Sequence, residues 1–176
     1  MRYLVIIHLL VLSCQIVRGQ SYEYDKDYEV GKKVYTTGLA LRYKTLLIQN
    51  KSNVNLTDGF KSFSTLEAQF DQSALVQSVK SVFGAKRLEY LAEHEPRPQF
   101  RVWFYFDKSG EVKSVSFAIH KNSNITLEEL SQMEEALKEI RFSNYIQGQK
   151  QSSTGYYDLT LGFRYKWLLE GRVWKE

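Results

Sequence analysis

Two runs of alternating apolar residues, separated by a short turn, restrict the folds open to this chain more than any other feature. A phenylalanine or valine fills every second position from 100 to 106, and the same alternation continues through Val115, Phe117 and Ile119. The intervening sequence from Asp107 to Gly110 suits a tight turn in which glycine adopts a positive φ. A period of two is typical of a strand with one buried face. The sequence therefore predicts an antiparallel hairpin over residues 100–119.

Two helical patterns and two further strand patterns surround this hairpin. Residues 64–84 and 126–142 carry apolar side chains at helical spacing, and each segment begins with a capping-box pair. These pairs are Ser64 with Glu67 and Thr126 with Glu129. Residues 39–48 and 157–167 read as strands, whereas residues 85–93 fit either a further helical turn or an irregular link. The order strand, helix, strand, strand, helix, strand predicts an α+β fold: an antiparallel sheet with two helices on one face.

The first nineteen residues have the pattern of a secretory signal peptide. Arg2 precedes a largely apolar run over residues 3–12, and small residues lead to a cleavage position after Gly19. A retained membrane helix is the alternative, but this run is about half of the ~20 residues that a spanning helix needs. A second alternative is a lipoprotein, because the residues before Cys14 loosely resemble a bacterial lipobox. The sequence predicts an exported protein, periplasmic or secreted, which contacts a membrane only if Cys14 is lipidated.

The remainder divides into an arm and one domain. Residues 20–36 mix charges with tyrosines and have no apolar period, so they predict an extended tyrosine-rich arm ahead of a single α+β domain at residues 37–176. Loss of Arg2 and Arg18 with the signal lowers the formal net charge from +4 to +2. This near-neutral balance, without a run of basic residues, argues against nucleic-acid binding.

No pattern of catalytic or metal-binding residues stands out after the signal. The two remaining histidines, His94 and His120, lack metal-ligand spacing and are expected to be solvated loop residues. The chain has no cysteine after the signal and no Gly-x-Ser-x-Gly or phosphate-loop sequence. Glu134 and Glu135 are expected on the polar face of the second helix. We therefore expect no enzyme activity, no cofactor and no metal.

Residues 100–166 resemble the carboxy-terminal periplasmic domain of TonB-type energy transducers. The hairpin has that family's Asp-x-x-Gly-x-Val turn at Asp107, Gly110 and Val112, the second helix ends in Ile-Arg-Phe at 140–142, and an alternating strand follows. The transducers' membrane helix, proline-rich span and Pro-x-Tyr-Pro motif are absent, so the resemblance implies the fold and not force transduction. The whole chain also resembles small exported proteins of unknown function from Bacteroides-type bacteria.

The candidate interaction surface lies on the side of the hairpin opposite the phenylalanines. If helices cover only the phenylalanine face, Trp103 and Tyr105 are exposed, and exposed aromatic residues mark interaction surfaces. The alternative is a sheet covered on both faces, by the arm or by a second chain. The full set of candidate residues is Trp103, Tyr105, Tyr156, Thr160 and Arg164.

Two functions remain open from the sequence. The first is a protein-interaction or accessory module of the cell envelope, whose partner protein or peptide adds a strand to a sheet edge. The resemblance to the transducer domain assigns that edge to residues 157–167. The second is binding of a carbohydrate or small ligand through Trp103 and Tyr105. The sequence does not predict an oligomeric state.

Overall fold

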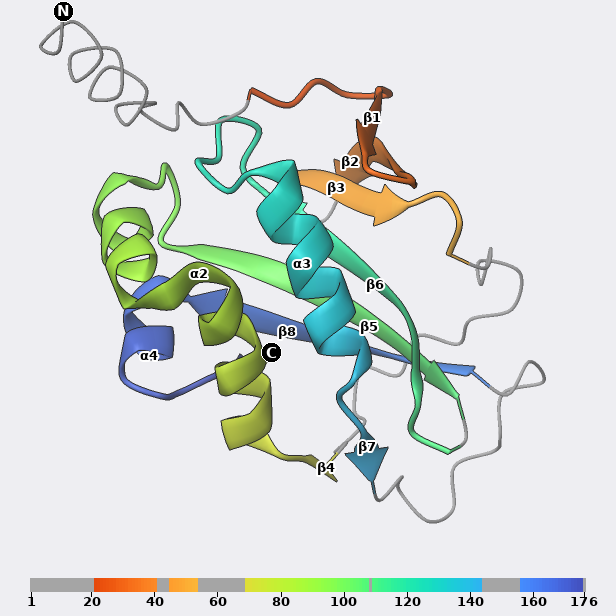
Figure 1. Ribbon diagram of the computed structural model, residues 1–176, viewed down its shortest axis with the longest axis vertical. Helices are drawn as coiled ribbons and strands as arrows, with labels where there is room; N and C mark the ends of the chain where they lie inside the picture. Colours follow the sequence, from red (N-terminus) through yellow and green to blue (C-terminus); the bar gives the residue numbers. More distant parts are fainter. Residues whose placement is uncertain (1–20, 41–44, 54–68, 108, 144–155, 176) are drawn as a thin grey trace, which may run out of the picture.

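The computed structural model describes residues 21–40, 45–53, 69–107, 109–143 and 156–175. Seven strands form one antiparallel sheet in the order β1-β2-β3-β6-β5-β8-β9, and helices α2 and α3 cover one face of it (Figure 1). This arrangement confirms the predicted α+β class. The strands of the sheet are β1 (Asp27–Val30), β2 (Lys33–Ala40), β3 (Thr45–Asn50), β5 (Gln99–Asp107), β6 (Val112–Ile119), β8 (Tyr156–Arg164) and β9 (Trp174–Lys175). The helices are α2 (Gln72–His94), α3 (Leu127–Lys138) and α4 (Tyr165–Leu169), and a separate small sheet pairs β4 (Gln69–Phe70) with β7 (Phe142–Ser143).

The predicted central hairpin is confirmed by the pairing of β5 with β6. The alternating apolar side chains of β5 are all buried on the helix-covered face. Gly110 closes the turn with φ 81°, and the Asp107 carboxylate accepts hydrogen bonds from the amide (2.8 Å) and hydroxyl (2.6 Å) of Ser109. Burial by itself would raise the pKa of Asp107, but the bonds from Ser109, Lys113 and the Glu111 amide outweigh it and lower the pKa to about 2. Local turn chemistry therefore sets the register of the hairpin.

Helix α3 begins where the sequence predicts and ends earlier. The Thr126 hydroxyl accepts from the Glu129 amide (3.2 Å), and the Glu129 carboxylate accepts from the Thr126 amide (2.7 Å), which completes the capping box. The helix stops at Lys138, and Phe142 belongs to β7. The Phe142 ring stacks on that of Phe106 at 4.6 Å. The helix is shorter than predicted because this buried ring contact draws the chain back to the sheet.

Helix α2 differs from its prediction at both ends. It starts at Gln72, where the Asp71 carboxylate accepts from the Ala74 amide (2.9 Å); the predicted capping pair at 64 and 67 lies outside the described residues. Gly84 adopts φ 69° and kinks the helix instead of ending it. The helix resumes to His94 because the apolar pattern returns, with Leu88 and Leu91 buried.

The N-terminal part of the sheet is more extensive than the sequence suggests. The expected strand over residues 39–48 is instead the hairpin of β2 and β3, and residues 20–36 supply β1 and the start of β2. The predicted arm is therefore largely part of the sheet. Two of its tyrosines are anchored, since the Tyr22 hydroxyl donates to the Ile125 carbonyl oxygen (2.8 Å) and Tyr35 is fully buried. The pattern was hard to recognise because β1 and β2 lie at the edge and bury few side chains.

The last long strand is shorter than its alternating pattern. β8 ends at Arg164, and the next five residues turn into α4. The Tyr165 amide donates to the Pro98 carbonyl oxygen (3.3 Å), and the side chains of Tyr165 and Leu168 are buried. The apolar positions at 165 and 168 thus pack at helical spacing, so the predicted strand over 157–167 is wrong in its last three residues.

Candidate interaction surface

Four of the candidate residues, Trp103, Tyr105, Thr160 and Arg164, come together on β5 and β8, on the sheet face opposite the helices. Directly paired residues place their side chains on the same face, and Trp103 pairs with Thr160 while Tyr105 pairs with Asp158. Along the same ladder, Arg164 pairs with Gln99 and Tyr156 pairs with Asp107. The sequence therefore located one continuous strip of the sheet.

The two aromatic side chains in this strip are half-buried and not exposed as the sequence suggested. On the neighbouring strand, Ser116 pairs with Trp103 and Ser114 pairs with Tyr105, and both serines are almost fully buried. Small side chains between large ones let the rings lie along the sheet. Burial raises the pKa of Tyr105, and the charge of Asp158 adds to this effect. The surface is therefore a half-buried aromatic strip.

Among the described strands, the outer side of β8 is paired along only a short part of its length. β8 pairs with β5 along all nine of its residues but with β9 only at Leu161 and Gly162. β8 is therefore next to the last strand of the described sheet and is not its outermost strand. The reason is the turn of α4, which returns the chain to lay β9 beside the end of β8.

The direction of the backbone groups in β8 follows from one hydrogen bond. The bond from Tyr165 to Pro98 continues the β5–β8 ladder and shows that odd-numbered residues point their amides toward β5. Because this direction alternates along an antiparallel strand, even-numbered residues such as Thr160 and Gly162 point theirs outward. Gly162 faces Trp174 of β9 on that side. Among the described strands, β9 reaches no further along β8 than Leu161.

The opposite edge of the sheet is short and charged. β1 has four residues, of which Asp27 and Glu29 are exposed. Lys51, which follows β3, forms an ion pair with Asp27 at 2.5 Å. Charged side chains and short strands are common features that keep an edge from pairing with another chain. Of the two ends of the sheet, the β8 side is therefore the better candidate for strand addition.

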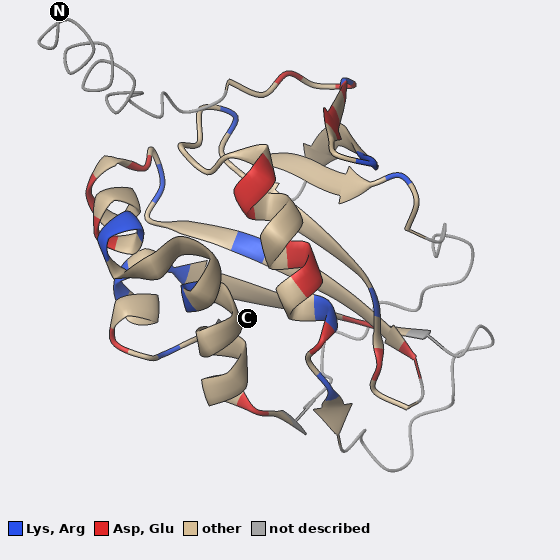
Figure 2. Ribbon diagram, viewed as in Figure 1, with Lys and Arg blue, Asp and Glu red and all other residues tan. Residues whose placement is uncertain are grey.

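A buried polar network around Glu134 was missed from the sequence. This residue was expected on the polar face of its helix, yet it is 0% exposed, and acidic residues recur along α3 beside the β2–β3 strands (Figure 2). Its carboxylate accepts hydrogen bonds from five side chains of β2, α3 and the end of β3. The donors are the Tyr35 hydroxyl (2.5 Å), Lys138 Nζ (2.7 Å), Asn53 Nδ2 (3.1 Å), Asn50 Nδ2 (3.2 Å) and Lys33 Nζ (3.4 Å).

The electrostatics of this network suit a structural role. Burial by itself would raise the pKa of Glu134, but the bonds from Lys138 and Tyr35 outweigh it and hold the pKa below its ordinary value. Burial and the Glu134 carboxylate raise the pKa of Tyr35. A carboxylate that stays ionised and has donors on both oxygens is poorly placed to exchange protons. The site can be recognised only once Tyr35 and Asn50 are known to be paired in the β2–β3 hairpin. The sequence pattern did not predict that hairpin.

A second polar cluster fastens the end of α2 to the start of α3. Arg87 donates to the Glu129 carboxylate (2.7 Å) and to the Asn124 carbonyl oxygen (2.6 Å), and the Glu95 carboxylate accepts from the Ser123 hydroxyl (3.0 Å).

Within the described ranges, no group of three or more His, Cys, Asp or Glu side chains could hold a metal ion. The same part of the chain contains no helix with the length and apolar character to cross a membrane.

Comparison with known proteins identifies the fold. A scan against protein-family models and a search of curated proteins found no match to this chain. The chain is similar to the crystal structure of a DUF5043 family protein from Bacteroides uniformis, with a TM-score of 0.62 and 18% sequence identity over 83% of this chain and 88% of that one. This finding agrees with the resemblance to Bacteroides-type proteins of unknown function, while the resemblance to TonB-type transducers stays a prediction. The molecule thus has the same fold as a DUF5043 family protein.

Proposed function

We propose that this chain is a non-catalytic, exported protein of the bacterial cell envelope that binds a partner protein or peptide by strand addition beside β8. The observation that carries the proposal is the unequal pairing of β8, which has nine residues bonded to β5 but only two paired with β9. The outward amide of Thr160 lies next to the end of that short pairing. A partner strand would extend the ladder there with backbone hydrogen bonds.

The chemistry of the described side chains supports binding more than catalysis. The most buried carboxylate of the described residues, Glu134, is held by five donors, and the aromatic strip of Trp103 and Tyr105 is half-buried. A backbone edge beside such a strip can take an extended peptide, whose alternate side chains would then lie over the strip. The signal-peptide pattern at residues 1–19 supports a location outside the cytoplasm for this activity.

Site-specific photo-crosslinking tests the proposal. The full chain, produced with its own leader in a Bacteroides host, would carry a photoreactive residue at position 160 or, as a control, at the exposed position Lys32 in the β1–β2 turn. We expect one partner to be crosslinked from position 160 and not from position 32. The same partner should be lost in Thr160→Pro, which removes the outward donor, and weakened in Thr160→Lys, which adds a charge at the edge.

Controls separate binding from folding. Circular dichroism and thermal unfolding must show that each variant is folded, and Thr160→Lys keeps the test valid if Thr160→Pro does not fold. Equal crosslinking from positions 160 and 32, or full binding by a folded Thr160→Pro, would contradict strand addition at β8. If Trp103→Ala instead abolishes binding on a glycan array while Thr160→Pro retains it, the carbohydrate alternative replaces the proposal.

A further inference from the structure

The residues that lead into β1 are fastened to a distant part of the domain. We call residues 21–26 the N-terminal strap. Tyr22 is its anchor: the side chain is 2% exposed, the amide donates to the Lys121 carbonyl oxygen (3.0 Å), and the hydroxyl donates to the Ile125 carbonyl oxygen (2.8 Å). The Tyr22 ring also packs edge-on against that of Tyr28, with 5.7 Å between the ring centres. The strap is therefore fixed to the loop that precedes α3.

The backbone of the N-terminal strap is bonded as well, chiefly to Thr37 of β2. The Thr37 hydroxyl donates to the Glu23 carbonyl oxygen (2.7 Å) and accepts from the Lys26 amide (3.0 Å). The Thr37 carbonyl oxygen accepts from the Asp25 amide (3.2 Å), and the Glu23 amide donates to the Tyr28 hydroxyl (2.8 Å). The backbone amides at positions 22, 23, 25 and 26 are thus all occupied, and they cannot pair with another chain while the strap is docked.

The loop that receives the anchor is held from its other side by the end of α2. The Glu95 carboxylate accepts from the Ser123 hydroxyl (3.0 Å), and Arg87 donates to the Asn124 carbonyl oxygen (2.6 Å). The docking site for the strap therefore exists only after α2 and the loop over residues 121–125 have come together.

The anchor lies close to the predicted cleavage position and reaches its docking site late. Tyr22 is the third residue after Gly19, and it is 103 residues away from Ile125 in the sequence. At about 5–20 residues per second, synthesis of a segment of that length takes roughly 5–20 s. During this interval the strap has no site on which to dock.

We propose that the signal peptide is removed before the N-terminal strap docks, and that docking then closes the strap to peptidases. This inference rests on the export that forms part of the proposed function. In the cleavage step, water is added across the peptide bond between Gly19 and Gln20, which lie outside the described residues. The step leaves a carboxylate on the signal peptide and an amine on the mature chain. Cleavage beside a docked segment requires that segment to open first, and the docked strap is closed by its anchor and by its occupied amides.

A timed processing assay on the full chain, signal peptide included, tests the proposal. The chain is unfolded in urea and diluted into buffer, and a purified bacterial signal peptidase in detergent is added after increasing delays. Mass spectrometry measures the cleaved fraction, and tryptophan fluorescence measures folding. We expect the wild type to be cleaved readily when peptidase is present at dilution, and at least about tenfold more slowly once it has folded. Tyr22→Ala should remain readily cleaved after folding.

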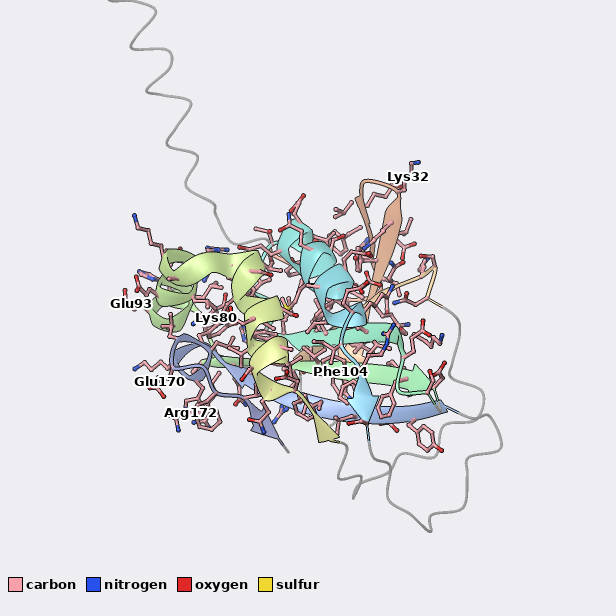
Figure 3. The ribbon with its side chains drawn as sticks, turned by 60° about the horizontal axis from the view of Figure 1, so that its bottom comes forward. Lys32, Lys80, Glu93, Phe104, Glu170 and Arg172 are labelled. Carbon is pink, nitrogen blue, oxygen red and sulfur yellow. The ribbon has the colours of Figure 1, made fainter. Side chains whose placement is uncertain are left out.

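Tyr24→Ala is the matched control, because it makes the same change at an exposed tyrosine of the strap, and it should be protected like the wild type. Lys32→Ala is a second control at the β1–β2 turn, where Figure 3 shows the side chain pointing away from the rest of the molecule. Thr37→Val removes the hydroxyl bonds to the strap and keeps Tyr22. It should be cleaved faster than the wild type, and it keeps the test valid if Tyr22→Ala does not fold.

The outcomes distinguish failure of this inference from failure of the proposed function. Equal cleavage of folded and unfolded wild type would overturn the inference and leave export intact, as would equal protection of the wild type and both strap variants. Cleavage of folded Tyr24→Ala as fast as that of Tyr22→Ala would overturn the role of the anchor. No cleavage of the unfolded wild type would show that residues 1–19 are not a removable signal peptide, and the proposed export would then fail together with the inference.

Discussion

The two halves of the sheet are joined to the elements beside them by different kinds of contact. Strands β2 and β3 are tied to α3 by the polar network around Glu134, in which a single carboxylate collects donors from three elements. Strands β5 and β8 are joined to β7 by aromatic rings, with Phe106 stacked on both Phe142 (4.6 Å) and Tyr157 (5.8 Å). The polar half ends in the charged strand β1, and the aromatic half ends in β8 and the two-residue strand β9.

This difference explains why one half was predictable and the other was not. Apolar contacts are non-directional and leave a periodic trace in the sequence, because every second residue of β5 must be buried. Directional bonds to a buried carboxylate depend on where three separate elements meet, and they leave no periodic trace. The same contrast predicts that the two halves respond differently to substitution and to pH.

The largest effect is expected from Phe106→Ala in the aromatic half. The side chain is fully buried, and its removal leaves a cavity between β5, β7 and β8 that should lower the free energy of unfolding by about 4 kcal/mol. Urea titration measures this change. Tyr90→Ala, at an exposed aromatic position on α2, should cost less than about 1 kcal/mol. Similar losses in the two variants would show that the rings of β5 and β7 do not hold this half.

An intermediate effect is expected from Glu134→Gln in the polar half. The substitution keeps the size of the side chain but removes its negative charge. That charge forms ion pairs with Lys138 and Lys33 and strengthens the hydrogen bond from the Tyr35 hydroxyl. We expect a loss of about 2–3 kcal/mol and faster amide hydrogen exchange in β2 and β3 than in β5. The neighbouring Glu135→Gln, with its side chain 63% exposed, should change stability by less than about 0.5 kcal/mol. Uniformly faster exchange across the sheet would mean that the network does not act on one half.

The smallest effect is expected at the hairpin turn and depends on pH. Folding lowers the pKa of Asp107 from its ordinary value of 3.8 to about 2, so the ionised carboxylate stabilises the folded state above pH 3.8 and loses this contribution as the pH falls toward 2. Asp107→Asn should therefore unfold more easily than the wild type at pH 7, by less than about 1 kcal/mol because the carboxylate is partly solvated. The difference should shrink between pH 4 and pH 2 in chemical denaturation. A difference that is constant across this range would exclude the charge of Asp107 as its cause.

Most of the fold could be predicted from local patterns. The β5–β6 hairpin, the capping box of Thr126 and Glu129, and the order of the main elements all follow from residues close together in the sequence. Two of the errors share one cause. The pattern predicted a helix end at Gly84 and a strand at residues 165–167. Periodicity over a few residues does not show whether contacts with distant residues favour continuing the helix or strand or turning the chain.

The candidate surface was only partly predictable. Alternation placed Trp103, Tyr105 and Thr160 on one face, which the register confirms. Their half-burial depends on small residues of β6, and the cover that β9 gives to β8 depends on the turn of α4.

The sequence by itself determined which apolar residues of β5, β6 and α3 turn toward the core, because burial of apolar side chains imposes a period on a strand or helix. Only the tertiary structure decided that Glu134 is buried and that Arg164 and Arg172 meet on Trp167. A buried charge is stable only where donors from other elements converge on it. Such convergence is a property of the assembled layers and not of any one segment.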